Sequence, residues 1–146
     1  MELEEKIQTI EDKLALKQLV DTFSILSDEK NGLAQKGLFT SDAVVKIVIN
    51  DELKQTLNGP EEIGNAYHNY LTSLDKVFHL NGQHVVNVKG NRALGRCYSQ
   101  ATIFETQNGV QVMTQEGIYH DDEYRKENDR WLIAKRTTHY VWIIRK

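Results

Sequence analysis

The hydrophobic pattern of this chain changes its period near Asp75, and that change constrains the fold more than any other feature. Before Asp75, most apolar residues recur every three or four positions, as they do on helices. After it come four strand-like runs, residues 77–89, 92–105, 111–124 and 130–144. Short turns of Gly, Asn, Gln and Asp separate these runs, which is typical of β-hairpins. The second half of the chain is therefore predicted to be a long antiparallel meander.

The chain is predicted to begin with a helix that ends near Asp28. Two sets of apolar residues at helical spacing indicate it: Leu3, Ile7, Ile10 and Leu14, then Leu16, Leu19, Val20, Phe23 and Leu26. Residues 9–12 resemble a capping box, from which this helix would start or restart.

The segment between this helix and Asp75 is expected to hold two more helices and a hairpin. A short helix is expected over residues 31–38, stopped by residues 40–42. The β-branched run 43–49 and a weaker run to Leu57 indicate strands. A third helix is expected to begin at Pro60, because proline is tolerated in a first helical turn.

This order of elements predicts an α+β fold in one domain, residues 1–146. Three helices cannot cover both faces of a six-stranded sheet, but they can fill the hollow of a strongly curved one. The expected shape is a cone with an internal pocket, in which the sheet is mostly antiparallel. Gly82, inside the first long run, predicts a bulge or a sharp bend.

Composition excludes several classes of protein. Lys and Arg total 18 against 21 Asp and Glu, a formal charge of −3, and no basic stretch indicates a nucleic-acid partner. The one cysteine, Cys97, excludes an internal disulfide and a multi-cysteine zinc site, which fits a cytoplasmic location. No signal peptide is apparent, and no apolar run approaches the ~18 residues of a membrane span. The chain has no nucleotide-binding motif, so no cofactor is expected.

Seven short segments, in this order and spacing, carry a family resemblance. They are residues 26–28, 32–34, 38–43, 59–63, 78–82, 117–119 and 131–136. Together they resemble the SnoaL-like branch of the nuclear-transport-factor-2-like (NTF2-like) superfamily over nearly the whole chain. The resemblance implies the cone-shaped cystatin-like roll and a wide range of chemistry, from polyketide cyclases and scytalone dehydratase to lindane dehydrochlorinase and proteins without a known reaction. Fold alone does not decide among these.

The resemblance implies a catalytic pair, Asp28 and His79. The matching positions in scytalone dehydratase and the dehydrochlorinase carry a base histidine and the carboxylate that orients it. Imidazole can take a proton at neutral pH, and a carboxylate on its second nitrogen stabilises the charged form. A simpler interpretation stays open, because an Asp after a helix is often a solvated turn residue and a lone His in an apolar strand is often a core residue.

Further pocket residues are expected around this pair. Arg136 matches a pocket arginine of the dehydrochlorinase and would bind an anionic group, unless it forms a surface salt bridge with the nearby acidic hairpin. Tyr119 would present its hydroxyl to the substrate. The apolar or small wall residues are expected to be Phe23, Leu26, Phe39, Cys97 and Ser99.

The sequence also departs from these enzymes. Phe23 stands where the dehydrochlorinase pattern has a lysine, and Ser27 where scytalone dehydratase has a tyrosine. The dehydratase has a second pocket histidine near the position of Gly117, whereas His120 lies on the opposite face by simple alternation. A regular strand points residues five apart to opposite faces, so a metal site made by His79 with His84 and His139 stays open only if a bulge at Gly82 brings His79 and His84 to one face.

Two hypotheses follow. In the first, the protein is a cofactor-free lyase, isomerase or cyclase that acts on a small apolar or aromatic molecule. In the second, it is a non-catalytic module for ligand binding or oligomerisation. A homodimer is expected in either case, through the outer face that carries Tyr98, Gln100 and Thr102.

Overall fold

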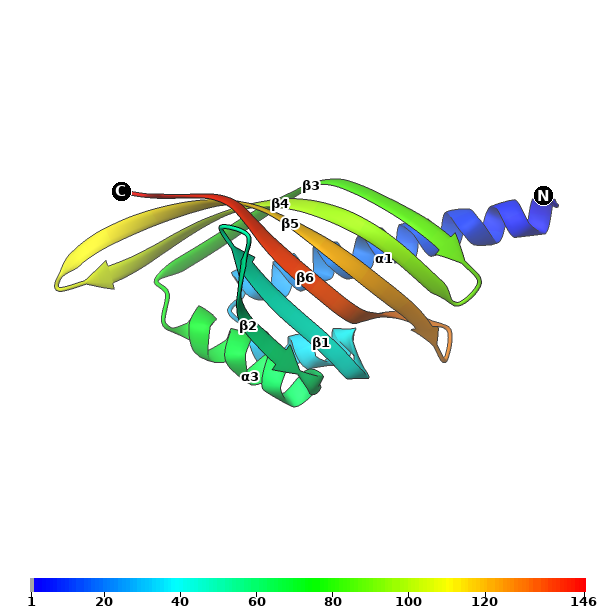
Figure 1. Cartoon of the computed structure of the whole chain (residues 1–146), viewed down its shortest axis with the longest axis horizontal. Helices are drawn as coiled ribbons and strands as arrows, with labels where there is room; N and C mark the ends of the chain where they lie inside the picture. Colours follow the sequence, from blue (N-terminus) through cyan, green and yellow to red (C-terminus); the bar gives the residue numbers. More distant parts are fainter. Residues whose placement is uncertain (1) are drawn as a thin grey trace.

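The meander predicted after Asp75 is present in the computed structural model, which describes residues 2–146 (Figure 1). Its four long strands are β3 (Lys76–Lys89), β4 (Arg92–Gln107), β5 (Val110–Glu127) and β6 (Arg130–Arg145). Upstream lie α1 (Leu3–Asp28), α2 (Gly32–Gln35), a 3-10 turn (Lys36–Leu38), β1 (Phe39–Ile49), β2 (Glu52–Asn58) and α3 (Gly59–Thr72).

All six strands form one sheet in the order β2-β1-β6-β5-β4-β3. Strands β1 and β6 pair in parallel, and the other neighbours pair antiparallel. The sheet arches over the helices without closing into a barrel, with α1 running beneath β3 and α3 beneath β1 (Figure 1). The prediction of an α+β cone with a mostly antiparallel six-stranded sheet is confirmed.

The bulge predicted at Gly82 is also confirmed. The register of β3 against β4 shifts between Asn81 and His84, so His84 points to the same face of the sheet as His79. A second irregularity lies between Gly117 and Ile118 in the pairing of β5 with β6. Bulges bend the strands that contain them, and these two contribute to the curvature of the sheet.

Three local predictions were wrong. Helix α1 is continuous from Leu3, and the Thr9 hydroxyl bonds back to the Glu5 carbonyl inside the helix, so residues 9–12 are not a cap. The second helix is a single turn followed by a 3-10 turn. Strand β1 begins at Phe39, because Phe39 pairs with Ile133 of β6 and its ring is buried. Residues 40–42 therefore belong to the strand.

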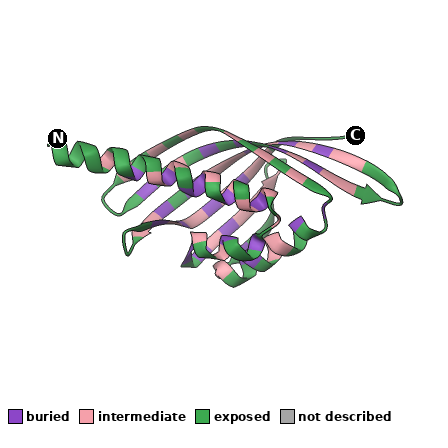
Figure 2. Cartoon of the chain, turned by 180° about the vertical axis from the view of Figure 1, so that it is seen from behind, coloured by how far each residue is buried: buried purple, intermediate pink, exposed green. Residues whose placement is uncertain are grey.

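The core lies between the helices and the concave face of the sheet. Helix α1 contributes Leu16, Leu19, Val20 and Phe23 to it. Figure 2 shows these buried positions along the second half of α1, whereas its first half is exposed. Near the middle of the helix, Asp12 accepts hydrogen bonds from Trp131 Nε1 (3.0 Å) and Lys126 Nζ (3.1 Å). Within residues 2–146, no helix has the length and apolar character to cross a membrane.

Candidate active site

A cavity of about 550 Å³ lies under the concave face of the sheet. It exists because α1 packs mainly against β3 and α3 mainly against β1, strands far apart in the sheet, and the two helices leave a hollow between them. Its wall is mostly apolar and aromatic, with Phe23, Ile47, Leu57, Tyr67, Leu71, Val77, Ile103, Ile118, Tyr140 and Ile143. The polar groups on the wall include His79, His120, Glu116, Thr138 and Arg145.

The structure brings Asp28 and His79 together at this cavity. Asp28 is the last residue of α1, and its Oδ1 lies 2.7 Å from His79 Nδ1 on β3. Both side chains are partly buried, at 29% and 18% exposed. An ionised carboxylate can only accept a hydrogen bond, so Nδ1 donates the proton, and in a neutral imidazole Nε2 then keeps its lone pair. Because His79 lines the cavity, the pair has the arrangement of an oriented base.

Three hydrogen bonds made by the Asn81 side chain connect β3 to α1 close to this pair. The Asn81 side-chain amide donates to Asp21 Oδ1 (3.0 Å) and to the Val20 carbonyl (3.2 Å). The Ser24 hydroxyl donates to Asn81 Oδ1 at 3.0 Å. These bonds hold the helix and the strand in one register, and so they set the distance between Asp28 and His79.

His120 is a cavity residue that the sequence interpretation missed. Its Nδ1 lies 2.9 Å from Thr138 Oγ1, and both residues line the cavity. Burial holds the pKa of His120 well below its ordinary value, and the neighbouring charges of Arg136, His79 and His139 act in the same direction. At neutral pH, His120 is therefore an uncharged imidazole that faces the same space as His79.

The error arose from the facing of Gly117. Gly117 pairs with Gln100 and points to the outer face, where a Cβ would lie 2.3 Å from the Trp142 ring. Simple alternation along β5 then directs Glu116, Ile118 and His120 inward. The prediction assumed that Gly117 faces the pocket. Alternation from that position placed His120 on the opposite face.

Glu116 gives the cavity an acidic group. Burial raises the pKa of this carboxyl, while His79 and Arg145 lower it by a smaller amount. Tyr67 stands across the same cavity, and burial raises the pKa of its phenol to about 12. Burial also raises the pKa of Tyr70 and Tyr140. The three phenols therefore stay protonated and can donate hydrogen bonds to a ligand.

Arg136 does not lie where the resemblance implied. Its Nε and Nη2 donate to the two oxygens of Asp122 at 2.8 and 2.9 Å, and both side chains are almost completely buried. Burial lowers the pKa of the guanidinium, but Asp122 more than offsets this and raises it. The guanidinium lies 4.6 Å from the Phe23 ring, behind the cavity wall. It is neither a cavity residue nor a surface pair with the acidic hairpin.

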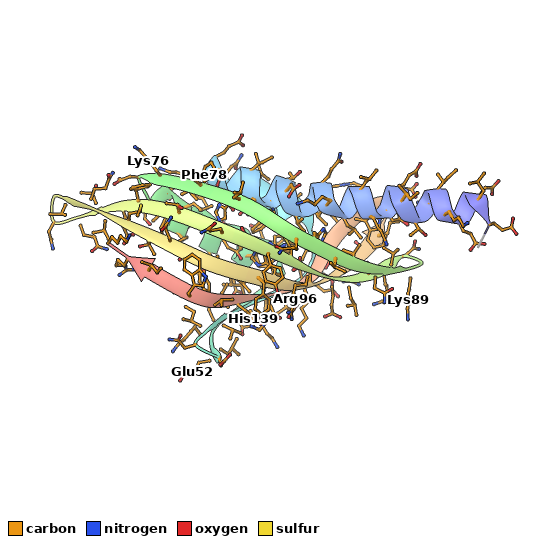
Figure 3. The ribbon with its side chains drawn as sticks, turned by 90° about the horizontal axis from the view of Figure 1, so that it is seen from above. Glu52, Lys76, Phe78, Lys89, Arg96 and His139 are labelled. Atoms are coloured by element: carbon orange, nitrogen blue, oxygen red, sulfur yellow. The ribbon has the colours of Figure 1, made fainter. Side chains whose placement is uncertain are left out.

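Tyr119 was also predicted wrongly, because it lies on the outer face of the sheet. It pairs with Tyr98, stacks on His139 at 4.5 Å and lies 4.2 Å from the Arg96 guanidinium. Figure 3 looks onto this face and labels Arg96 and His139 there.

The five predicted wall residues lie in different parts of the fold, and only one of them lines the cavity. Phe23 lines the cavity. Phe39 and Cys97 belong to the packed core, and burial raises the pKa of the Cys97 thiol to about 11. Leu26 is half-buried and does not line the cavity, and Ser99 is buried with no partner for its hydroxyl in the described chain.

The three histidines once considered for a metal lie apart. His79 faces the cavity, His84 Nε2 lies 3.1 Å from the Tyr124 hydroxyl, and His139 is on the outer face. Among residues 2–146, no group of three or more His, Cys, Asp and Glu side chains has the arrangement of a metal site.

Comparison with known proteins agrees with this architecture. Residues 8–137 match the family model of the SnoaL-like domain. A candidate scytalone dehydratase from Novosphingobium aromaticivorans superposes with a TM-score of 0.81 at 15% identity, covering 95% of this chain and 90% of its own. The hexachlorocyclohexane dehydrochlorinase LinA type 2 gives 0.81 at 13% identity, covering 97% and 93%.

A third similar structure is the Kfla4162 protein from Kribbella flavida. It gives a TM-score of 0.79 at 14% identity, and the match covers 93% of this chain and 95% of that one. Among curated proteins, none matches the chain in sequence. At these identities the structural matches establish the fold, and the chemistry has to be argued from the cavity.

Proposed function

The chain belongs to the family of SnoaL-like domains, and we propose that it is a cofactor-free enzyme of the lyase or isomerase type. It moves a proton on a small molecule that carries an acidic C–H next to a carbonyl group. The observation that supports this most directly is the 2.7 Å contact between Asp28 and a histidine that lines an otherwise apolar cavity.

In the first step, His79 acts as the base. Its Nε2 takes the proton from the substrate carbon, and the electron pair of the C–H bond moves onto the carbonyl oxygen to form an enolate. Asp28 keeps the imidazole in the correct tautomer and stabilises the positive charge that develops on it. The apolar wall excludes water and so strengthens each of these polar contacts.

The second step needs a group that stabilises the enolate oxygen, and we assign it to His120. Its ring is neutral because burial lowers its pKa, and Thr138 can donate to or accept from its Nδ1. When the Thr138 hydroxyl donates, His120 Nε2 carries the hydrogen and can donate to the substrate. The proton on His79 then returns to another carbon in an isomerisation, or a leaving group departs in an elimination.

The cavity also restricts the substrate. A volume of about 550 Å³ lies in the range of small-molecule sites. Its aromatic and aliphatic wall favours an apolar or aromatic compound, while the three phenols and Glu116 supply a few polar contacts. A carbonyl compound of one or two rings fits both requirements.

A non-catalytic ligand-binding module is the second candidate. One observation favours it: Phe23 lines the cavity where the dehydrochlorinase pattern has a lysine, and Ser27 stands where scytalone dehydratase has a tyrosine. A binding module would keep the cavity and its ligand but would need no proton transfer.

Deuterium exchange separates the two candidates. A panel of enolisable aromatic ketones is incubated with the protein in D₂O, and loss of the α-proton signal is followed by NMR. We expect exchange above the buffer rate for wild type and little for His79→Gln. His139→Gln, on the outer face, is the matched control and should exchange like wild type.

The coupling between the two residues is tested separately. The pKa of His79 is measured by NMR titration in wild type and in Asp28→Asn, where it should decrease because the carboxylate favours the charged imidazole. An unchanged pKa, together with ligand binding but no exchange, would contradict the enzyme and leave the binding module.

A further inference from the structure

The first half of α1 exposes a stripe of large apolar side chains. Leu3, Ile7, Ile10 and Leu14 are 71%, 48%, 59% and 62% exposed. Figure 1 shows this end of the helix projecting past the sheet at the N-terminus, and Figure 2 shows it exposed on nearly all sides. Exposed apolar residues at such density indicate a contact surface.

The stripe is distinct from the face that packs on the sheet. At about 100° per residue, its centre lies roughly 160° around the helix from Leu16, Leu19, Val20 and Phe23, the buried face. Helix α1 therefore has two apolar faces that point in opposite directions, and the sheet covers only one. The last polar anchor of the helix to the sheet is Asp12, beyond which the stripe continues outward.

The spacing of the stripe is that of a coiled coil. Intervals of four, three and four residues match alternating d and a positions of a heptad repeat. The positions that flank such a stripe are Glu4 and Glu11 on one side and Lys6 and Lys13 on the other. None of these four charges has an ion-pair partner within 4.0 Å in the part of the chain that the structure describes.

The flanking charges specify the partner and its direction. In a parallel pair of identical helices, Lys6 faces Glu11 of the second copy, and the contact occurs twice by symmetry. In an antiparallel pair, lysine would face lysine and glutamate would face glutamate, which is repulsive. The stripe is therefore complementary to itself in one orientation.

We propose that the first half of α1 binds the same segment of a second copy of this chain, as a short parallel two-stranded coiled coil. The sheet lies on the far side of each helix, so the two bodies stay outside the contact. The helix is already held by its packing on the sheet, and pairing does not have to nucleate it. The stripe spans two heptads and ends at the Lys17–Asp21 ion pair, so association is reversible and depends on concentration.

Sedimentation equilibrium over a wide concentration range tests this pairing. Ile7→Gln/Ile10→Gln should weaken self-association by more than about tenfold, because each change removes apolar contact area on both copies. Glu2→Gln/Glu5→Gln, at the same end of the helix but away from the stripe, is the matched control and should associate like wild type. All four positions are exposed, so none of these variants should lose its fold, which far-UV circular dichroism checks.

The direction of pairing is tested by charge exchange. Lys6→Glu alone should weaken association, and Lys6→Glu/Glu11→Lys should restore it. Stronger association of Lys6→Glu would indicate antiparallel helices and would overturn the proposal. Three other outcomes would also overturn it: a protein that stays monomeric at every concentration, one that binds lipid vesicles but not itself, or a dimer insensitive to the Ile7→Gln/Ile10→Gln change. The last of these would place the contact on the outer face of the sheet.

Discussion

Asp122 and Glu116 lie on the same strand and point to the same face of the sheet, but their surroundings are opposite. Asp122 is surrounded by donors: Arg136 binds both of its oxygens and the Tyr124 hydroxyl donates to it at 2.7 Å. We call this region, with His84 on Tyr124, the closed end. Glu116 faces the cavity, where it has no hydrogen bond or ion pair to any residue of 2–146.

The difference shows where the fold leaves room for a ligand. At the closed end, α1 packs down on the sheet, and every buried charge has a partner from the chain itself. At the cavity end, α1 and α3 diverge, and the polar groups on the same strands face an open space. Under the proposed function, Glu116, which lines the cavity, is available to contact the ligand.

The largest expected effect compares two aspartates. Asp122→Ala leaves the Arg136 charge buried and unpaired, which should decrease the free energy of unfolding by about 3–5 kcal/mol. Asp28→Ala removes a partly exposed partner and should cost about 1 kcal/mol or less. Urea unfolding of both variants measures the difference. Equal losses would mean that the two ends do not differ in the way described.

The second effect is on proton transfer, and here the larger loss is expected from a change at the cavity end. Under the proposed function, His79→Gln should decrease α-proton exchange by about 100-fold or more, since it removes the base. His84→Gln, a histidine at the closed end, should leave exchange close to that of wild type. Both rates come from the same NMR assay. Equal losses in the two variants would indicate a general structural effect in place of a catalytic one.

A third, smaller effect compares two tyrosines. Tyr124→Phe removes the donor to Asp122 and should cost about 1–2 kcal/mol of unfolding free energy. Tyr67→Phe removes the hydroxyl of a side chain that lines the cavity, so it should change stability by less than about 0.5 kcal/mol and should weaken ligand binding instead. Thermal unfolding and ligand titration by NMR measure the two quantities. A Tyr67→Phe variant as unstable as Tyr124→Phe would contradict the distinction.

The smallest effect is a pH dependence at the cavity. Burial raises the pKa of Glu116 above its ordinary 4.5, so the folded protein binds this proton more tightly than the unfolded chain does. The stabilisation of the folded protein by this bound proton is fully present below pH 4.5 and is lost as the pH rises through the folded-state pKa of Glu116. Glu116→Gln should therefore be more stable than wild type at neutral pH, and the gain should shrink in acid.

Urea unfolding at several pH values checks this, with the exposed Glu123→Gln as control. A Glu116→Gln variant that keeps the pH dependence of wild type would show that burial does not raise the pKa of this carboxyl.

Most of the fold could be predicted because it depends on local patterns. The meander, the turn positions, the Gly82 bulge and a third helix with Pro60 in its first turn all appear where the hydrophobic period and the turn residues indicated. The start of β1 could not be found in this way. Phe39 is held in the strand by its pairing with Ile133, a contact between residues far apart in the sequence.

The candidate site also has residues that could be predicted from the sequence and residues that could not. The resemblance identified Asp28 and His79, and the structure places them within hydrogen-bond distance. Arg136 was assigned to the pocket by the resemblance and Tyr119 by its place in the strand, and His120 was left out. Whether a strand residue points inward depends on the register of its strand, and one wrong starting residue reverses every assignment along it.

By itself, the sequence determined the type and order of the elements, the family resemblance and the presence of a histidine with a possible carboxylate partner. The type and order of the elements follow from residue spacing, which reflects the geometry of single helices and strands, whereas the histidine with its possible carboxylate partner follows from the resemblance. Only the tertiary structure decided that Arg136 is held by Asp122, that Tyr119 faces outward and that His120 joins His79 at the cavity. Those outcomes depend on how β5 pairs with β4 and β6 and on how α1 lies across the sheet, and both are set by contacts between distant parts of the chain.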